Sequence, residues 1–282
     1  MDKKILATLW VLGNKESFRG VADRFDLNKG FLHNIFIEVC EALRVVRPQF
    51  IMWPTRPEQA QIAGNFVQKT GFPGVVGCID GTHIPIPGPS DHRASYINRK
   101  GFPSIQLQAV CDDKLRFLDV CAGWPGSVAD ARVFRNCPLR EILEGGDLIG
   151  ENHLLGDSAY GLAPYMMVPF RDNGHLNYIQ VNYNRCHSSA RVAIERAFGL
   201  LKSKFRRLQY LDMKLLQKIP LMIMATCVLH NFILMREKLD LDLELQNINI
   251  AIDANIQNEV PPQQVDNIVA MNKRNTLADL LA

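Results

Sequence analysis

Apolar residues recur at helical spacing through the first 50 residues of the chain. The pattern forms two runs separated by Asp26-Leu27-Asn28, and Asn28 is of a residue type that favours the start of a helix. A short helix, a tight turn and a longer helix are the outline of a helix-turn-helix, in which Lys29, His33 and Asn34 would face DNA. A helical cap without DNA contacts gives the same pattern, so both interpretations stay open.

From Gly71 onwards the pattern changes from helices to strands. Residues 75–80 form an apolar run between Pro73-Gly74 and Gly81. Residues 104–111 and 115–122 form two further runs on either side of an Asp-Asp-Lys turn. These three segments predict an antiparallel three-strand meander. Next come, in order, a helix after Gly126-Ser127, a short helix at 139–143, a strand at 153–156, an irregular segment at 161–188 and amphipathic helices at 189–208 and 215–237.

The order of strand meander, helix, strand and helix predicts an α/β (α+β) domain of the ribonuclease H-like type, with a mixed sheet flanked by helices. We expect this domain to span residues 71–238, after a helical region at 1–70. Residues 239–282 are acidic and rich in Asn and Gln, which indicates a flexible tail with a short helix at 276–281.

Three acidic residues occupy informative places in this order. Asp80 ends the first strand, Asp157 follows a later strand, and Glu195 lies on the helix at 189–208. In the expected fold these carboxylates converge at one edge of the sheet, where they could hold the divalent cations that phosphodiester hydrolysis uses. Each residue alone has a structural interpretation, since Asp80 could start a turn and Asp157 could cap a helix.

A basic stretch surrounds Glu195. Nine basic residues lie between positions 185 and 218 against two acidic ones. Arg191, Lys202 and Arg206 share one helical face with Glu195, which suits contacts with DNA phosphates. A solvated charged face is the structural alternative for such a run.

The overall composition limits the choice of function less than these positions do. The net charge of +3 identifies no partner. Seven cysteines lack metal-ligand spacing, so we expect reduced, mostly buried thiols in an intracellular protein. The longest apolar stretch, 219–229, is too short for a membrane span. A sugar hydrolase with paired carboxylates is disfavoured because the three tryptophans do not gather near the acids.

Six ordered blocks between residues 71 and 234 resemble the PIF/Harbinger transposase family, which includes a domesticated nuclease. The blocks are GCIDGTHIPIPGP (77–89), NRKGFPSIQLQAVCD (98–112), GSVADARVF (126–134), LLGDSAYG (154–161), ARVAIERAFGLLKSKFRRL (190–208) and VLHNF (228–232). The spacing of Arg191, Glu195 and Lys202 also resembles the signature helix of related insertion-sequence transposases. Those transposases carry a Tyr where this chain has Ser188.

The resemblance implies a function and a site. It implies that Asp80, Asp157 and Glu195 are catalytic, that Asp130 is a further ligand, and that the cofactor is Mg²⁺ or Mn²⁺. It also implies a DNA endonuclease of the transposase type and a Myb/SANT-like partner protein. Transposition needs two copies of the enzyme, so we expect a homo-oligomer, and the short apolar stretches indicate a protein of nucleus and cytoplasm with no membrane association. The alternative is a domesticated DNA-binding or adaptor protein with a relic nuclease site.

Overall fold

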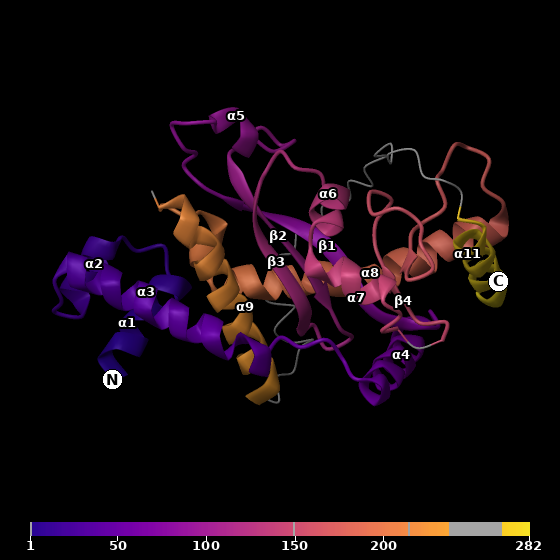
Figure 1. Cartoon of the computed structure of the whole chain (residues 1–282), viewed down its shortest axis with the longest axis horizontal. Coiled ribbons are helices and arrows are strands. Elements are labelled where there is room, and N and C mark those ends of the chain that lie inside the picture. The colour runs from indigo at the N-terminus through magenta and orange to yellow at the C-terminus, as the bar shows by residue number, and fades with distance from the viewer. Residues whose placement is uncertain (1, 149, 214, 237–266) are drawn as a thin grey trace.

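The computed structural model describes residues 2–148, 150–213, 215–236 and 267–282. A central sheet separates the N-terminal helices at one end of the molecule from the C-terminal helix at the other (Figure 1). The N-terminal helices are α1 (Asp2–Gly13), α2 (Phe18–Arg24) and α3 (Lys29–Val46), and the C-terminal helix is α11 (Ile268–Leu280).

One mixed sheet of five strands forms the centre, in the order β3-β2-β1-β4-β5. The strands β1 (Val75–Pro85), β2 (Ser104–Cys111) and β3 (Phe117–Pro125) are antiparallel, so the predicted meander is confirmed. On the other side of β1, β4 (His153–Leu155) is parallel to it and β5 (Met166–Met167) is parallel to β4. This mixed sheet with flanking helices is the α/β, ribonuclease H-like arrangement that the sequence predicts.

Helices cover both faces of the sheet. On one face α4 (Arg56–Thr70) and α8 (Tyr178–Lys204) contact β1, and α9 (Ile219–Arg236) contacts β3. On the other face α6 (Asp130–Arg135) contacts β2 and is followed by α7 (Pro138–Glu144). The shorter helices are α5 (Arg93–Tyr96), η1 (Arg47–Gln49), η2 (Arg206–Gln209) and η3 (Leu216–Lys218).

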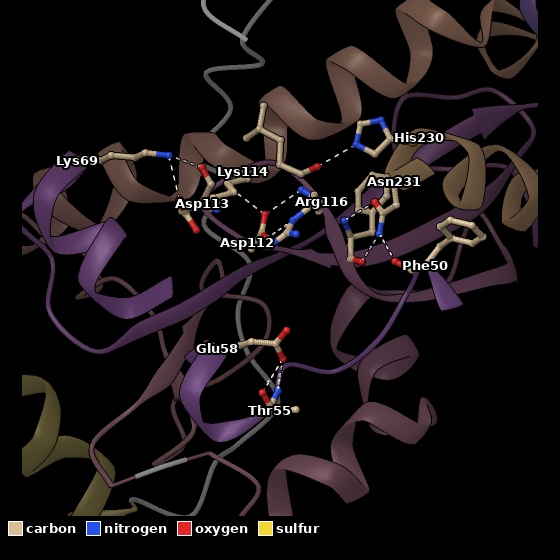
Figure 2. Close-up of polar contacts among 12 residues, drawn as sticks. Phe50, Thr55, Glu58, Lys69, Asp112, Asp113, Lys114, Arg116, His230 and Asn231 are labelled. Atoms are coloured by element: carbon tan, nitrogen blue, oxygen red, sulfur yellow. Dashed lines mark hydrogen bonds and ion pairs between the residues drawn. The ribbon is translucent and has the colours of Figure 1, made fainter. Parts of the chain in front are cut away.

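The VLHNF block is a structural anchor. Asn231 on α9 is 1% exposed; its Oδ1 accepts from Phe117 N (2.8 Å), and its Nδ2 donates to Phe117 O (2.7 Å) and Phe50 O (2.8 Å). The neighbouring His230 is 2.8 Å from Leu115 O through Nε2, and burial lowers its pKa to about 4 (Figure 2). One asparagine therefore joins α9, the start of β3 and the segment that leads out of the N-terminal helices.

The N-terminal region has the predicted helix-turn-helix outline. Asn28 caps α3, because its Oδ1 accepts from Gly30 N (2.8 Å) and Phe31 N (3.4 Å). The short α2 precedes the turn, capped by Ser17 through Gly20 N (3.1 Å). The helices also pack on the rest of the protein, since α3 contacts α9 and α1 contacts η2.

The prediction for residues 161–188 was wrong in its second half. The helix α8 begins at Tyr178, where Asn177 and Gln180 form a capping box, and not at 189. Its first turns expose Tyr178 and Val181, but Tyr183 and His187 continue the buried stripe towards Ala190. The helix also ends at Lys204, so Arg206 lies in η2 and does not share the helical face predicted for it.

A flexible tail does not describe residues 267–282. These residues form α11, longer than the expected helix at 276–281, and α11 contacts α8. Lys273 donates to Pro164 O (2.7 Å), and the Arg274 guanidinium lies 4.0 Å from the centre of the Phe170 ring. The helix also buries Ala270, Leu277 and Ala278, so polar side chains and an apolar face together hold it. The acidic residues between 239 and 266 lie outside the described residues.

Two further expectations are affected by the structure. Cys121 of β3 and Cys137 form a disulfide across 16 residues, so the expectation of seven reduced thiols was wrong for this pair. Residues Leu216–Arg236 are long and apolar enough to cross a membrane, yet 56% of the apolar stretch is buried within the fold. The contacts of α9 with α3 and β3 account for its apolar character.

Candidate functional site

Asp80 lies in the middle of β1, on the face that α8 covers. Cys78 Sγ donates to Ala190 O of α8 (3.4 Å), and side chains alternate along a strand, so Cys78, Asp80 and Thr82 all face that helix. Asp80 Oδ1 accepts from Gly81 N (2.8 Å) and its Oδ2 from Arg191 Nη2 (2.9 Å). Both oxygens of this carboxylate therefore have donors.

Asp157 follows β4 directly after Gly156. Because Cys78 pairs with Leu155 in the parallel β1–β4 ladder, Asp80 and Asp157 each lie two residues beyond that pair. A Cβ at Gly156 would stand 2.9 Å from Met166 Sδ, so a side chain there would disturb the close packing of this turn. Asp157 Oδ1 accepts from Ala159 N (3.0 Å), so the residue also stabilises the turn after β4.

Asp130, the first residue of α6, approaches from the opposite face of the sheet. Its Oδ1 accepts a short hydrogen bond from Gln106 Nε2, and its backbone oxygen accepts from Gln108 Nε2 (3.2 Å). A Cβ at Gly81 would overlap Asp130 Oδ1. Glycine at position 81 is therefore what lets Asp130 reach the neighbourhood of Asp80.

Asp80, Asp130 and Asp157 form a compact cluster. One carboxylate oxygen from each lies within 4.8 Å of the other two. Burial, then Asp80 and Asp157, raise the pKa of Asp130 to about 7; burial, then Asp80, raise the pKa of Asp157. Three acids so close together are costly when all are ionised. The arrangement suits a positive charge held between them.

Arg191 of α8 supplies one such charge. Its Nη2 pairs with Asp80 Oδ2 at 2.9 Å and lies 3.9 Å from Glu195 Oε1. Burial alone would lower the pKa of this guanidinium, but Asp80 and Asp157 raise it above its ordinary value. Glu195 is not part of the three-aspartate cluster among the described residues. The Arg191 guanidinium lies between Glu195 and Asp80, since Glu195 Oε1 and Asp80 Oδ2 both approach Nη2.

The other predicted DNA-contacting residues lie farther from the aspartates. Lys202 Nζ donates to Thr82 Oγ1 (2.6 Å) and His83 O (3.1 Å), which links α8 to β1 two residues beyond Asp80. Arg206 is exposed. At the start of α3, Lys29 and Asn34 are exposed, while the half-buried His33 ring packs 5.6 Å from that of Phe18. These DNA contacts stay predictions.

Two residues of the site were missed from the sequence. Gln106 and Gln108 are each 2% exposed and lie on one face of β2. Gln108 Nε2 also donates to Tyr160 Oη (3.0 Å), and Gln106 Oε1 is buried without a partner among the described residues. Paired amides at alternate positions of an apolar strand were the available signal, because a buried amide needs polar neighbours.

The residues present fit a divalent cation. The cluster offers only oxygen ligands, which hard cations such as Mg²⁺ and Mn²⁺ prefer. Burial, and after it the neighbouring carboxylates, raise the pKa values of Asp130 and Asp157, and a bound cation would offset the repulsion between the carboxylates. Asp80, Asp130 and Asp157 would hold such an ion, and Glu195 is close enough to Arg191 to belong to the same charged centre.

A mixed sheet that brings aspartates from β1, from the turn after β4 and from α6 to one point defines a carboxylate-based, metal-dependent class of protein. Comparison with known proteins gives the particular family. Residues 79–231 match the family described as DDE superfamily endonuclease. The chain therefore belongs to the DDE superfamily endonucleases.

Individual relatives agree with this assignment. The chain is 32% identical over 240 residues to "Putative nuclease HARBI1" of Bos taurus. The aligned region covers 82% of this chain and 66% of the relative. The chain is 30% identical over 258 residues to "Protein ALP1-like" of Arabidopsis thaliana, covering 86% of this chain and 63% of that relative. The chain thus spans slightly less than two thirds of these relatives. No solved structure matches it.

Proposed function

We propose that this protein is a metal-dependent DNA endonuclease of the transposase type, which hydrolyses phosphodiester bonds at the aspartate cluster. The observation that carries the proposal is the convergence of Asp80, Asp130 and Asp157 within 4.8 Å, in a family named for endonucleases. Glu195 completes the proposed catalytic set from α8. Cleavage would leave a 3′ hydroxyl, which a transposase could then use for strand transfer.

Each residue has a distinct task in this proposal. Asp80 would hold the cation from the middle of β1 and Asp157 from the turn after its parallel neighbour β4, while Asp130 is fixed by Gln106 and Gln108. A bound divalent cation, Mg²⁺ or Mn²⁺, would activate the attacking water and stabilise the leaving oxygen. Lys202, Arg206 and Arg191 bind backbone phosphates and orient the DNA, and the start of α3 contacts DNA through Lys29, His33 and Asn34.

The wider biology stays a set of proposals that rest on the resemblance. We expect a homo-oligomer, because joining two DNA ends needs two active sites, and light scattering of the purified protein tests it. Co-precipitation tests binding to a Myb/SANT-like protein. Imaging of a tagged chain tests residence in nucleus and cytoplasm.

The proposed activity is tested by nicking of supercoiled DNA. The purified protein is incubated with Mg²⁺ or Mn²⁺, beside Asp80→Ala and Asp172→Asn. Asp172 is an exposed aspartate whose Oδ1 accepts from Gly174 N (2.8 Å) in a surface turn, which asparagine can also do. We expect nicking by the wild type and by Asp172→Asn, lost on chelation of the metal.

The same assay, together with a DNA-binding measurement, distinguishes the proposed nuclease from the alternative, a DNA-binding or adaptor protein with a relic site. Asp80→Ala should retain most of its DNA affinity and lose cleavage. Equal nicking by Asp80→Ala and the wild type, or no nicking by the wild type with either cation, would contradict the proposed function.

A further inference from the structure

Arg191 lies inside the carboxylate cluster rather than on the surface of α8. Its side chain is 19% exposed, and Nη2 is the atom that approaches both Asp80 and Glu195. Its Nε is buried and has no hydrogen-bond partner among the described residues. A guanidinium carries five N–H donors in a planar fork. Arg191 therefore keeps donor capacity beyond the ion pair with Asp80.

Each oxygen of Asp80 already accepts a hydrogen bond, so a cation that binds this carboxylate comes close to one of the two donors. Asp80 Oδ1 accepts from the backbone N–H of Gly81, which is fixed within β1, and its Oδ2 accepts from Arg191. Of these two donors only the guanidinium is on a flexible side chain. A divalent cation bound to Asp80 would also repel the positive guanidinium. The cation and Arg191 therefore compete for one carboxylate.

A displaced Arg191 has an obvious class of new ligand. Its planar fork matches a phosphate group, and it stays charged at any pH of interest. The side chain emerges from α8 on the face that also carries Lys202, whose Nζ reaches Thr82 on the same strand as Asp80. A DNA backbone following these two residues would pass beside the aspartates.

We propose that Arg191 couples metal binding to DNA binding, because it holds Asp80 until a divalent cation takes that carboxylate and then binds a backbone phosphate. This inference rests on the proposed function, since it takes a divalent cation and DNA as ligands of the site. Thermodynamic linkage makes the coupling reciprocal: DNA strengthens cation binding by the factor by which the cation strengthens DNA binding. Each ligand then binds more tightly when the other is already present.

The first test measures Mn²⁺ binding to the full chain without DNA, by the electron paramagnetic resonance signal of the free ion. The variant is Arg191→Gln, and the matched control is Arg196→Gln, which removes an equal charge from an exposed position of the same helix. We expect Arg191→Gln to bind Mn²⁺ about 10-fold or more tightly than the control, in the range of ordinary coupling between sites. Equal or weaker binding would overturn the inference.

The second test adds a short DNA duplex, with a gel to verify that it remains intact. DNA should tighten Mn²⁺ binding by the wild type and by Arg196→Gln, and should do so much less for Arg191→Gln. An arginine with a merely structural role would leave this DNA effect unchanged, which would contradict the coupling.

Two outcomes separate folding and function from the inference itself. If Arg191→Gln is unstable alone, added Mn²⁺ should restore its thermal transition, because the ion replaces the missing positive charge; failure to recover counts against the coupling. If neither the wild type nor Arg196→Gln binds Mn²⁺, the proposed function fails as well. Normal Mn²⁺ binding that is indifferent to Arg191 refutes the coupling alone.

Discussion

Two buried polar centres of this protein are built in opposite ways. Around Asn231, one neutral amide meets three backbone groups at 2.7–2.8 Å, and its partners belong to elements far apart in the chain. Around Asp80, three carboxylates crowd together, one pKa is raised to about 7, and Gln106 Oε1 and Arg191 Nε lack partners among the described residues. The first centre stabilises the fold. The second leaves polar atoms unpaired within the described part of the chain, and these atoms could bind a ligand.

The largest effect should come from removing a ligand of the charged centre. Asp157→Asn keeps the size and the turn acceptor but removes a negative charge. We expect cleavage to fall by about 10³-fold or more, since a residue that acts within a catalytic unit carries most of the rate. Nicking assays measure this, with circular dichroism to show that the fold persists. Near-normal cleavage would remove Asp157 from the site.

The neutral centre should give the opposite result, a loss of stability. Asn231→Ala leaves the buried N–H and C=O of Phe117 without their side-chain partner and removes a link to Phe50. We expect the free energy of unfolding to fall by about 3 kcal/mol. Thermal and urea unfolding measure this beside Asn136→Ala, an exposed asparagine whose side chain donates to Arg132 O at a helix end. A loss no larger than that of the control would show that Asn231 is not an anchor.

The charged centre should respond to pH through Asp130. A cation needs the ionised carboxylate, and the pKa of Asp130 is raised to about 7. The apparent affinity for Mn²⁺ should therefore fall as the pH drops below 7, by up to about 10-fold per unit for one proton displaced. Binding measured between pH 6 and 8 tests this. A profile that is flat over that range would contradict the role of Asp130 as a ligand.

The smallest effect concerns the stability of the protein without added metal. The pKa of Asp130 is higher in the folded chain than in the unfolded one, so the folded state binds more protons between pH 4 and 7 and loses stability as the pH rises. Asp130→Asn removes this penalty, and we expect a gain of about 1–2 kcal/mol at pH 8 and little change at pH 4, close to the pKa of the unfolded chain. Unfolding curves at the two pH values measure it, and an equal change at both would contradict the charge-crowding explanation.

The sequence predicted much of the fold because its strands and its helix caps have strong local signals. The meander of β1 to β3, the cap at Asn28 and the strand before Asp157 all follow from periodicity and turn residues. The start of α8 did not, because its first turns expose the apolar residues Tyr178 and Val181, and only the capping box marks the boundary. The disulfide between Cys121 and Cys137 depends on tertiary contact, which residue spacing alone does not encode.

The sequence predicted which residues form the site better than it predicted how they lie relative to one another. Residue order placed Asp80 and Asp157 at the ends of neighbouring strands, and the register of β1 with β4 places both two residues beyond the Cys78–Leu155 pair. Helical spacing grouped Arg191 with Glu195, but a helix face does not reveal what lies opposite it. That Arg191 pairs with Asp80, and that Glu195 lies behind it, needed the packing of α8 on β1.

A difference in length between two strands has a consequence for how such a site can evolve. β1 runs for 11 residues, while its parallel neighbour β4 stops after 3, just where Gly156 and Asp157 begin. Had β4 continued, ladder hydrogen bonds would occupy the flank of β1 beside Asp80, and the chain would turn too late for Asp157 to face it. The meeting of these two aspartates thus depends on an early stop, and a small insertion after Leu155 would move Asp157 away from Asp80.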